Sequence, residues 1–237
     1  LEQFVSVVKP QFLSYDNYMV QYSLDLRDPA KAASYYKNLL EVRRVAMAHG
    51  IPFWNIVTSN QIRKFTTIPS PANLAFQAYT TLAAGGRGLS WYTYYAGGYG
   101  YAPIDSSGAR TLVWNHLAAI NREVGVIGPV VSRLRSMGVW FTTPPPVPGL
   151  PVLPGGSIRS VEADSPLMIG EFEGMDGGRY AMLVNLSLER STRFTVTTQG
   201  DRAVTDMLYP TDGLWRPVHI GEGYWLAAGN GVLFRLK

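Results

Sequence analysis

The first half of the chain repeats one pattern, a short apolar run followed by a stretch with apolar residues at helical spacing. The runs are QFLSYDNYMV at 11–20, IPFWNIVT at 51–58 and GLSWYTYY at 88–95. Such continuous apolar runs are typical of strands that helices cover on both faces, as in parallel sheets. The order strand, helix, strand, helix, strand therefore predicts a βαβαβ arrangement with a parallel sheet and an α/β fold class.

Helix start and stop signals separate these runs. Asp28 before Pro29 is typical of an N-cap followed by proline in the first turn, and Gly50 ends the helical pattern. The pair Ser70 and Pro71 repeats the signal, and the second helix should end at the two glycines 85–86. A third helix is expected from about residue 109, kinked or divided at its proline, residue 129.

The composition changes after residue 141. The stretch TTPPPVPGLPVLPGG carries six prolines and is typical of a linker or an extended strap. Short alternating runs separated by glycine-containing turns follow, and they predict a small antiparallel β-sandwich. We therefore expect part of an α/β domain at 1–141, a linker at 142–157 and a sandwich domain at 158–237. Glu171 and Glu173 alternate on a sandwich strand and are expected to face solvent.

Several classes of site are disfavoured by composition. The chain has no cysteine, so a disulfide or a thiol nucleophile is not possible, and its three histidines are too far apart to predict a zinc site. No metal or cofactor is therefore expected. The formal net charge is +4, but the basic residues are scattered, which does not favour nucleic-acid binding. No apolar stretch reaches the roughly 18 residues that a membrane span requires.

Polar and aromatic side chains gather where the three predicted strands end. In parallel sheets and barrels, ligands bind at the carboxyl ends of the strands. A sugar ring has apolar C–H faces that stack on aromatic rings and hydroxyls that need hydrogen-bond partners. A strand can also pack its aromatic residues against helices. The pattern nevertheless predicts a carbohydrate site, with these candidate substrate-binding residues: Asn17, Tyr18, Trp54, Asn55, Asn60, Trp91, Tyr92 and Tyr94.

Glycoside hydrolysis usually needs two carboxylates. Asp16 lies at the end of the first predicted strand, and Asp105 lies in the glycine- and tyrosine-rich loop AGGYGYAPIDSSGA. These two are the candidate catalytic residues, and Tyr18 is expected to orient a carboxylate. Neither of the other two strands ends in Asp or Glu, so the sequence does not show a complete catalytic pair.

Together the segments FLSYDNYMV, IPFWNIVTSN and NLAFQAYTTLAAGGRGLSWYTYY resemble the last three strand–helix units of a (β/α)₈-barrel glycoside hydrolase. The resemblance is nearest to the family 42 β-galactosidase-like enzymes of the large retaining clan. Gln77 and Ser90 to Tyr95 match the helix and eighth strand of such enzymes, and residues 167–237 are similar to their terminal β-sandwich. The resemblance implies a partial TIM barrel and a glycosidase that cleaves a polysaccharide or oligosaccharide.

The resemblance also implies that part of the catalytic site lies elsewhere. The acid/base Glu of the family follows the fourth barrel strand, which these residues do not include. Its nucleophile Glu follows the seventh strand, where this chain has residues 55–60 and no carboxylate.

Three strands cannot close a barrel, and an open parallel sheet has unpaired edges. The chain also opens on LEQFVSVV without an initiator Met or signal peptide. We therefore expect a fragment or subunit that associates with the missing half of the barrel, or a homodimer, and a secreted or periplasmic location. The alternatives are a chain that folds alone as an open layer, and a non-catalytic carbohydrate-binding or assembly module.

Overall fold

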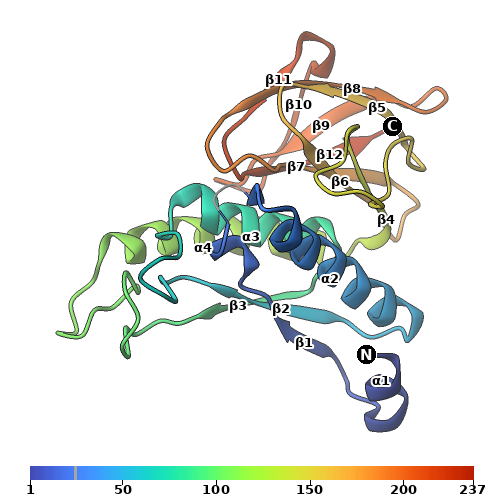
Figure 1. Ribbon diagram of the computed structural model, residues 1–237. Helices are drawn as coiled ribbons and strands as arrows, with labels where there is room; N and C mark the ends of the chain where they lie inside the picture. Colours follow the sequence, from blue (N-terminus) through green and yellow to red (C-terminus); the bar gives the residue numbers. More distant parts are fainter. Residues whose placement is uncertain (24–25) are drawn as a thin grey trace. The chain divides into compact units, whose positions relative to one another are not determined.

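The structure, a computed structural model, describes residues 1–23 and 26–237 (Figure 1). The chain forms two compact units. The first comprises Leu1–Ser70 with Gly86–Leu117, and the second comprises Pro71–Gly85 with Ala118–Lys237.

The first unit contains the parallel sheet that the sequence predicts. Its strands are β1 (Leu13–Asp16), β2 (Phe53–Thr58) and β3 (Gly88–Tyr92), and β2 lies in the middle (Figure 1). Both pairings are parallel. The first strand is shorter than the predicted run at 11–20, because the chain turns after Asp16 and enters the 3₁₀ helix η1 (Met19–Gln21).

Helix α2 (Pro29–Ala48) connects β1 to β2 and confirms the predicted capping signal. The Asp28 side chain accepts hydrogen bonds from the backbone N–H groups of Ala30 and Lys31, at 2.8 and 3.2 Å. These bonds satisfy two of the N–H groups that the first turn leaves without partners. The helix packs against β1 and β2 through a buried face made of Tyr35, Tyr36, Leu39, Val42 and Val45.

The strand register divides the sheet into two different faces. Leu13 and Phe53 are partners on the face toward α2 and are buried. On the opposite face, Ser14 is aligned with Trp54, and Trp54 with Gly88. The Trp54 side chain is 42% exposed and lies against the ring of Phe12. Side chains alternate between the faces of a strand, so this second face is the one open to a ligand or another segment.

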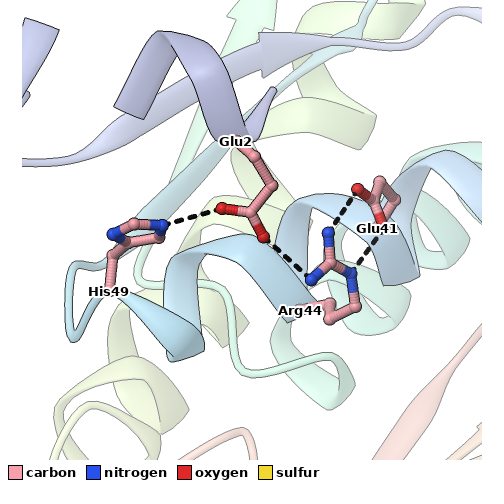
Figure 2. Close-up of polar contacts among 4 residues, drawn as sticks. All are labelled: Glu2, Glu41, Arg44 and His49. Carbon is pink, nitrogen blue, oxygen red and sulfur yellow. Dashed lines mark hydrogen bonds and ion pairs between the residues drawn. The ribbon is translucent and has the colours of Figure 1, made fainter. Parts of the chain in front are cut away.

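A short helix, α1 (Glu2–Val8), is attached to the C-terminal part of α2 by charged side chains (Figure 2). The Glu2 carboxylate lies 2.9 Å from the guanidinium of Arg44 and 2.8 Å from the ring of His49. Arg44 also pairs with Glu41 one turn earlier in α2. Hydrogen bonds from His49 and then Arg44 hold the pKa of Glu2 below its ordinary value.

This attachment should weaken in acid. A carboxylate with a lowered folded-state pKa stabilises the fold above the unfolded value of 4.5, and the contribution disappears as the pH falls through the folded pKa. We expect amide protection factors for residues 5–8, whose N–H groups are the ones bonded within the helix, to fall between pH 6 and about pH 3. Glu2→Gln should show low protection already at pH 6 in hydrogen exchange. Equal protection in both proteins at pH 6 would contradict this role.

The second unit consists of α3 (Pro71–Ala83), the greater part of α4 (Leu112–Val131) and two antiparallel sheets. The six-stranded sheet has the order β10-β9-β12-β7-β6-β4, and the three-stranded sheet has the order β11-β8-β5. The strand bounds are β4 (Arg135–Phe141), β5 (Ile158–Ala163), β6 (Leu167–Glu173), β7 (Arg179–Asn185), β8 (Thr192–Thr198), β9 (Val204–Leu208), β10 (Trp215–Pro217), β11 (Tyr224–Leu226) and β12 (Gly231–Leu236), with the 3₁₀ helix η3 (Ile220–Glu222) before β11.

One apolar core joins the two sheets. Ile158, Phe194 and Leu226 come from the three-stranded sheet, and Leu183 and Phe234 come from the six-stranded sheet. All five are buried. The structure therefore shows a mixed α/β chain with an antiparallel sandwich, as the alternating runs predict.

The region before the proline-rich stretch differs from the prediction. Helix α4 continues past Pro129 to Val131 and is not divided there. The chain then forms β4, which pairs with β6 in the six-stranded sheet. The second compact unit includes residues 118–141 and all of α3 together with the sandwich, and the domain division at 142–157 stays a prediction.

Helix α3 lies almost directly on the six-stranded sheet. A Cβ at Gly170 would lie 2.0 Å from the carbonyl oxygen of Ala83, and one at Gly231 would lie 2.4 Å from the ring of Tyr79. Residues 73–83 are all buried. Polar side chains of α3 form hydrogen bonds within the helix; for example, the Gln77 amide donates to the Asn73 side chain at 2.9 Å. This internal bonding allows a helix with polar residues to be buried.

Glu171 does not face solvent, contrary to the expectation. It is 2% exposed, and its carboxylate accepts hydrogen bonds from the backbone N–H groups of Ser157 and Ile158 at 2.7 to 3.0 Å. Glu173 is half-buried and pairs with Arg135 and Arg179. The buried carboxylate fixes the end of the proline-rich stretch to β6, because no other partner satisfies a buried N–H group as strongly as a charged acceptor.

Replacing Glu171 should therefore destabilise the fold. Glu171→Gln keeps the shape but turns an amide NH₂ toward backbone donors. We expect the free energy of unfolding in urea to fall by about 2 to 3 kcal/mol. The control Glu162→Ala removes an exposed carboxylate from β5 and should change it by less than about 0.5 kcal/mol. Equal stability of the Gln variant and the parent would contradict this account.

Candidate functional site

Four side chains from three segments meet at the carboxyl ends of the parallel strands. The Tyr18 hydroxyl hydrogen-bonds to the side chain of Asp16, the last residue of β1. The ring of Tyr18 stacks on Tyr92, the last residue of β3, with centroids 5.6 Å apart and planes 22° from parallel. The hydroxyl of Tyr92 lies 2.8 Å from that of Tyr99. The structure thus brings Asp16, Tyr18 and Tyr92 of the predicted site together.

The environment of Tyr18 disfavours its ionisation. Burial raises its pKa first, and the nearby Asp16 carboxylate adds to the effect, so the pKa reaches about 12. The Tyr18 hydroxyl therefore stays protonated at neutral pH and donates to Asp16. The structure places Tyr18 beside Asp16, and its role in orienting a catalytic carboxylate stays a prediction.

Asp16→Asn tests this contact directly. We expect the pKa of Tyr18 to fall from about 12 but to stay above 10.0, because burial, the largest cause, remains. A raised folded-state pKa stabilises the fold below pH 10.0, and this contribution is lost as the pH rises through the folded pKa. NMR titration of ring-labelled tyrosine measures the shift, with Asp201→Asn in an exposed turn as the control. An unchanged Tyr18 pKa in Asp16→Asn would contradict the contact.

The loops after β2 and β3 are paired with each other. The backbone N–H of Gln61 donates to the Gly100 carbonyl at 2.7 Å, and the N–H of Gly100 donates to the Gln61 carbonyl at 3.2 Å. The backbone N–H of Ser59 donates to the Tyr92 carbonyl at 2.8 Å, and the Ser59 hydroxyl donates to the Thr93 carbonyl at 3.2 Å. The peptide bond between Tyr92 and Thr93 is cis. The hydrogen bonds of Gln61, Gly100 and Ser59 hold the two loops side by side.

A cavity of about 610 Å³ lies between these two loops. Tyr99 belongs both to its wall and to the tyrosine cluster, so the cavity adjoins Asp16 through Tyr18 and Tyr92. This volume falls within the range of small-molecule sites. The residues that line it are Gln61, Ile62, Arg63, Lys64, Ala96, Gly98, Tyr99, Gly100, Tyr101, Ala102, Asp105, Ser106 and Thr111.

One buried side chain organises the first of these loops. Gln21 in η1 is completely buried, and its amide donates to the carbonyl of Asn60 and accepts from the N–H of Ile62. The hydroxyl of Thr66 lies 2.9 Å from the carbonyl of Arg63 and 3.3 Å from the amide oxygen of Gln21, and it can donate its one hydrogen to either. The loop at 60–67 is therefore a fixed structure with Gln21 at its centre.

Asp105 lines the cavity, but its carboxylate has a structural role. Its Oδ1 accepts from the Ser107 hydroxyl at 2.6 Å, and from the backbone N–H groups of Ser107 and Ala109 at 2.9 and 3.0 Å. The Ser107 hydroxyl and then these N–H groups lower the pKa of Asp105. Within residues 1–23 and 26–237, no hydrogen bond or ion pair joins Asp105 to Asp16.

The predicted asparagines lie inside the structure. Asn17 is buried on the side of α2, where its amide donates to the Ser34 carbonyl at 3.2 Å. Asn55 is completely buried and is aligned with Tyr15 on the α2 side of the sheet. Asn60 is also completely buried, and its amide makes no hydrogen bond within the part of the chain that the structure describes. None of the three is exposed to a sugar.

The predicted aromatic residues are divided between the two faces. Trp54 lies on the open face, and Trp91 is aligned with Val57 on the opposite face. Tyr94 is 58% exposed in the loop after β3. The strand register separates Trp54 from Trp91, so one ligand surface does not include both.

Sequence reasoning missed several residues of the cavity. Tyr99 and Tyr101 belong to the loop AGGYGYAP, whose aromatic residues are a signal for stacking. Gln61, Arg63 and Lys64 follow directly on the second predicted strand. Residues just beyond each strand end, rather than those within it, form this cavity.

No group of three or more metal-ligating residues occurs in the described ranges 1–23 and 26–237. Within the same residues, no helix has the length and apolar character that crossing a bilayer would require.

No family model matches the chain, and no curated protein matches it. Among solved structures, it is similar to the crystal structure of the GH51 arabinofuranosidase from Xanthomonas axonopodis pv. citri, with 12% sequence identity and a TM-score of 0.44. The match covers all of this chain and 55% of that one, so the chain spans about half the length of the solved protein. The name of that enzyme places it in GH51 and not in family 42. The resemblance of this chain to family 42 stays a prediction.

Proposed function

We propose that the chain carries the sugar-binding part of a glycoside hydrolase site. The observation that carries the proposal is the Asp16–Tyr18–Tyr92–Tyr99 cluster at the carboxyl ends of three parallel strands, beside a cavity of about 610 Å³. Ligands bind at this end of parallel α/β sheets because side chains from several strands converge there.

The chemistry of the cavity suits a carbohydrate. Tyr99 and Tyr101 offer aromatic rings to the C–H faces of a sugar, and the amide oxygen of Gln61 and the hydroxyl of Ser106 offer polar groups to its hydroxyls. The exposed Tyr94 and Tyr95 extend from the same loop. Tyr99, Tyr101 and Gln61 thus replace the buried asparagines as the proposed contacts.

Asp16 is the proposed catalytic carboxylate. Its side chain is exposed, and the Tyr18 hydroxyl lies beside it as a hydrogen-bond donor. It can act as a nucleophile toward the anomeric carbon, or as a base that takes a proton from the attacking water. A second carboxyl group must donate a proton to the leaving oxygen, and Asp105 is held in its own turn. We propose that further barrel strands supply this acid.

In this proposal, the parallel sheet is part of a (β/α)₈ barrel, with the open face of Trp54 toward the barrel interior. The remaining strands would come from a second chain or from another segment of a longer polypeptide, or a homodimer would cover the face. The exposed Trp54 and Phe12 support the need for such cover, since 42% and 43% of their side chains are accessible.

A non-catalytic carbohydrate-binding module is the second candidate. It is favoured by the single carboxylate in the cluster, because hydrolysis with retention or inversion needs a pair. The same cavity would then bind sugar without turnover.

The test compares the natural polypeptide with Asp16→Asn and with the exposed control Asp201→Asn. We expect a panel of plant and algal polysaccharides to include at least one that binds in calorimetry and releases reducing ends. Asp16→Asn should lower the hydrolysis rate by about 10² to 10⁴-fold with affinity retained. Asp201→Asn should match the parent.

Other outcomes separate the candidates. Hydrolysis that survives Asp16→Asn would show that another carboxylate is the catalyst. Binding without hydrolysis, weakened by Tyr99→Ala, would establish the binding module instead. Absence of binding to every carbohydrate in the panel would exclude both candidates.

A further inference from the structure

We infer that the cavity between the paired loops selects an anionic sugar, one that bears a carboxylate or a sulfate group, through Arg63 and Lys64. This inference rests on the proposed carbohydrate site and adds the charge of its ligand. It begins from the distribution of charge around the cavity.

The cavity wall has an excess of positive charge that no side chain in the described ranges neutralises. Arg63 and Lys64 both line it, and within residues 1–23 and 26–237 their side chains make no hydrogen bond or ion pair. The one lining carboxylate, Asp105, already accepts from the hydroxyl and N–H of Ser107 and from the N–H of Ala109. An anionic ligand would therefore meet two available cations.

The two cations are carried by a defined loop and not by a mobile one. Gln61 holds the turn by donating to the Thr66 carbonyl at 2.7 Å, and the Arg63 backbone bonds to Thr66 in both directions. The buried Gln21 anchors the same loop from below. None of these bonds uses the charged ends of Arg63 or Lys64. Within the described residues, the loop therefore fixes the backbone from which the two side chains extend and leaves their charged ends available to a ligand.

Aromatic residues accompany the charges. Tyr99 and Tyr101 line the same cavity, and Tyr101 is 54% exposed. A neutral sugar needs only the rings and the polar groups. The combination of aromatic rings with two unneutralised cations fits a sugar ring that also carries a negative group.

A single-stranded nucleic acid also combines rings with negative charge, but the cavity fits it less well. Binding of a strand requires a track of cations along several phosphates. Here two adjacent cations share one cavity with a carboxylate, Asp105. A single anionic group on a sugar matches this arrangement better.

The experiment uses matched polysaccharide pairs with the full 237-residue chain. Polygalacturonate and alginate are each compared with their carboxyl-reduced forms, and dextran sulfate is compared with dextran. Reduction changes the carboxylate to an alcohol and leaves the linkage intact. We expect the anionic member of at least one pair to bind more than tenfold more tightly in calorimetry. Salt at about 1 M, where the screening length is about 3 Å, should remove most of this difference.

Variants assign the selectivity to the cavity. Arg63→Gln and Lys64→Gln should each weaken the anionic sugar roughly three- to tenfold and leave the neutral one unchanged. Arg63→Lys keeps the charge and should retain most of the affinity. Lys37→Gln removes an exposed cation of α2 outside the cavity and controls for the loss of net charge.

The outcomes distinguish this inference from the proposed function. Equal binding of anionic and reduced forms, unaffected by the Gln variants, overturns the anionic selectivity and leaves the carbohydrate site standing. An equal loss in Lys37→Gln shows general charge attraction and also overturns it. Failure of every polysaccharide to bind overturns the proposed function together with this inference. Tighter, salt-sensitive binding of an RNA homopolymer, lost in the Gln variants, assigns the cavity to nucleic acid.

Discussion

The parallel register of β1, β2 and β3 determines which side chains reach the strand ends on the open face of the sheet. It aligns Asp16 with Ile56 and Ser90 on the open face, while Tyr15, Asn55 and Leu89 lie toward α2. Since side chains alternate along a strand, a shift by one residue would turn Asp16 toward the helix and Tyr15 outward. The Asp16–Tyr18 contact and the stacking on Tyr92 depend on this alignment.

Beyond the strand ends, two loops of different character are joined by backbone bonds between Gln61 and Gly100. The first carries charge and is organised from within by the buried Gln21. The second carries tyrosines and glycines, and its Tyr99 returns to the strand ends. The sheet thus supplies the carboxylate, and the loops supply the walls.

Local signals predicted the parts of the fold that depend on local bonds. The Asp28 cap bonds only to the next few residues, so the sequence shows where α2 begins. The expectation that Glu171 faces solvent is wrong because its partners, Ser157 and Ile158, lie more than ten residues away in the sequence. The residue type of Asn17 fits a sugar site. However, Asn17 follows directly on Asp16, and its side chain points to the other side, where it bonds to Ser34 of α2. Contacts of this kind are set by tertiary pairing, which a residue pattern does not contain.

The hydrogen bond between the Tyr92 and Tyr99 hydroxyls can run in either direction. Each phenol carries one hydroxyl hydrogen, and their mutual contact at 2.8 Å uses only one of the two. Whichever tyrosine donates, the other keeps a hydrogen that it can direct to a third group. Because Tyr99 forms part of the cavity wall, the pair can offer either a donor or an acceptor to a ligand by reversing one bond. A hydroxyl group on a sugar, which both donates and accepts, is matched by either state.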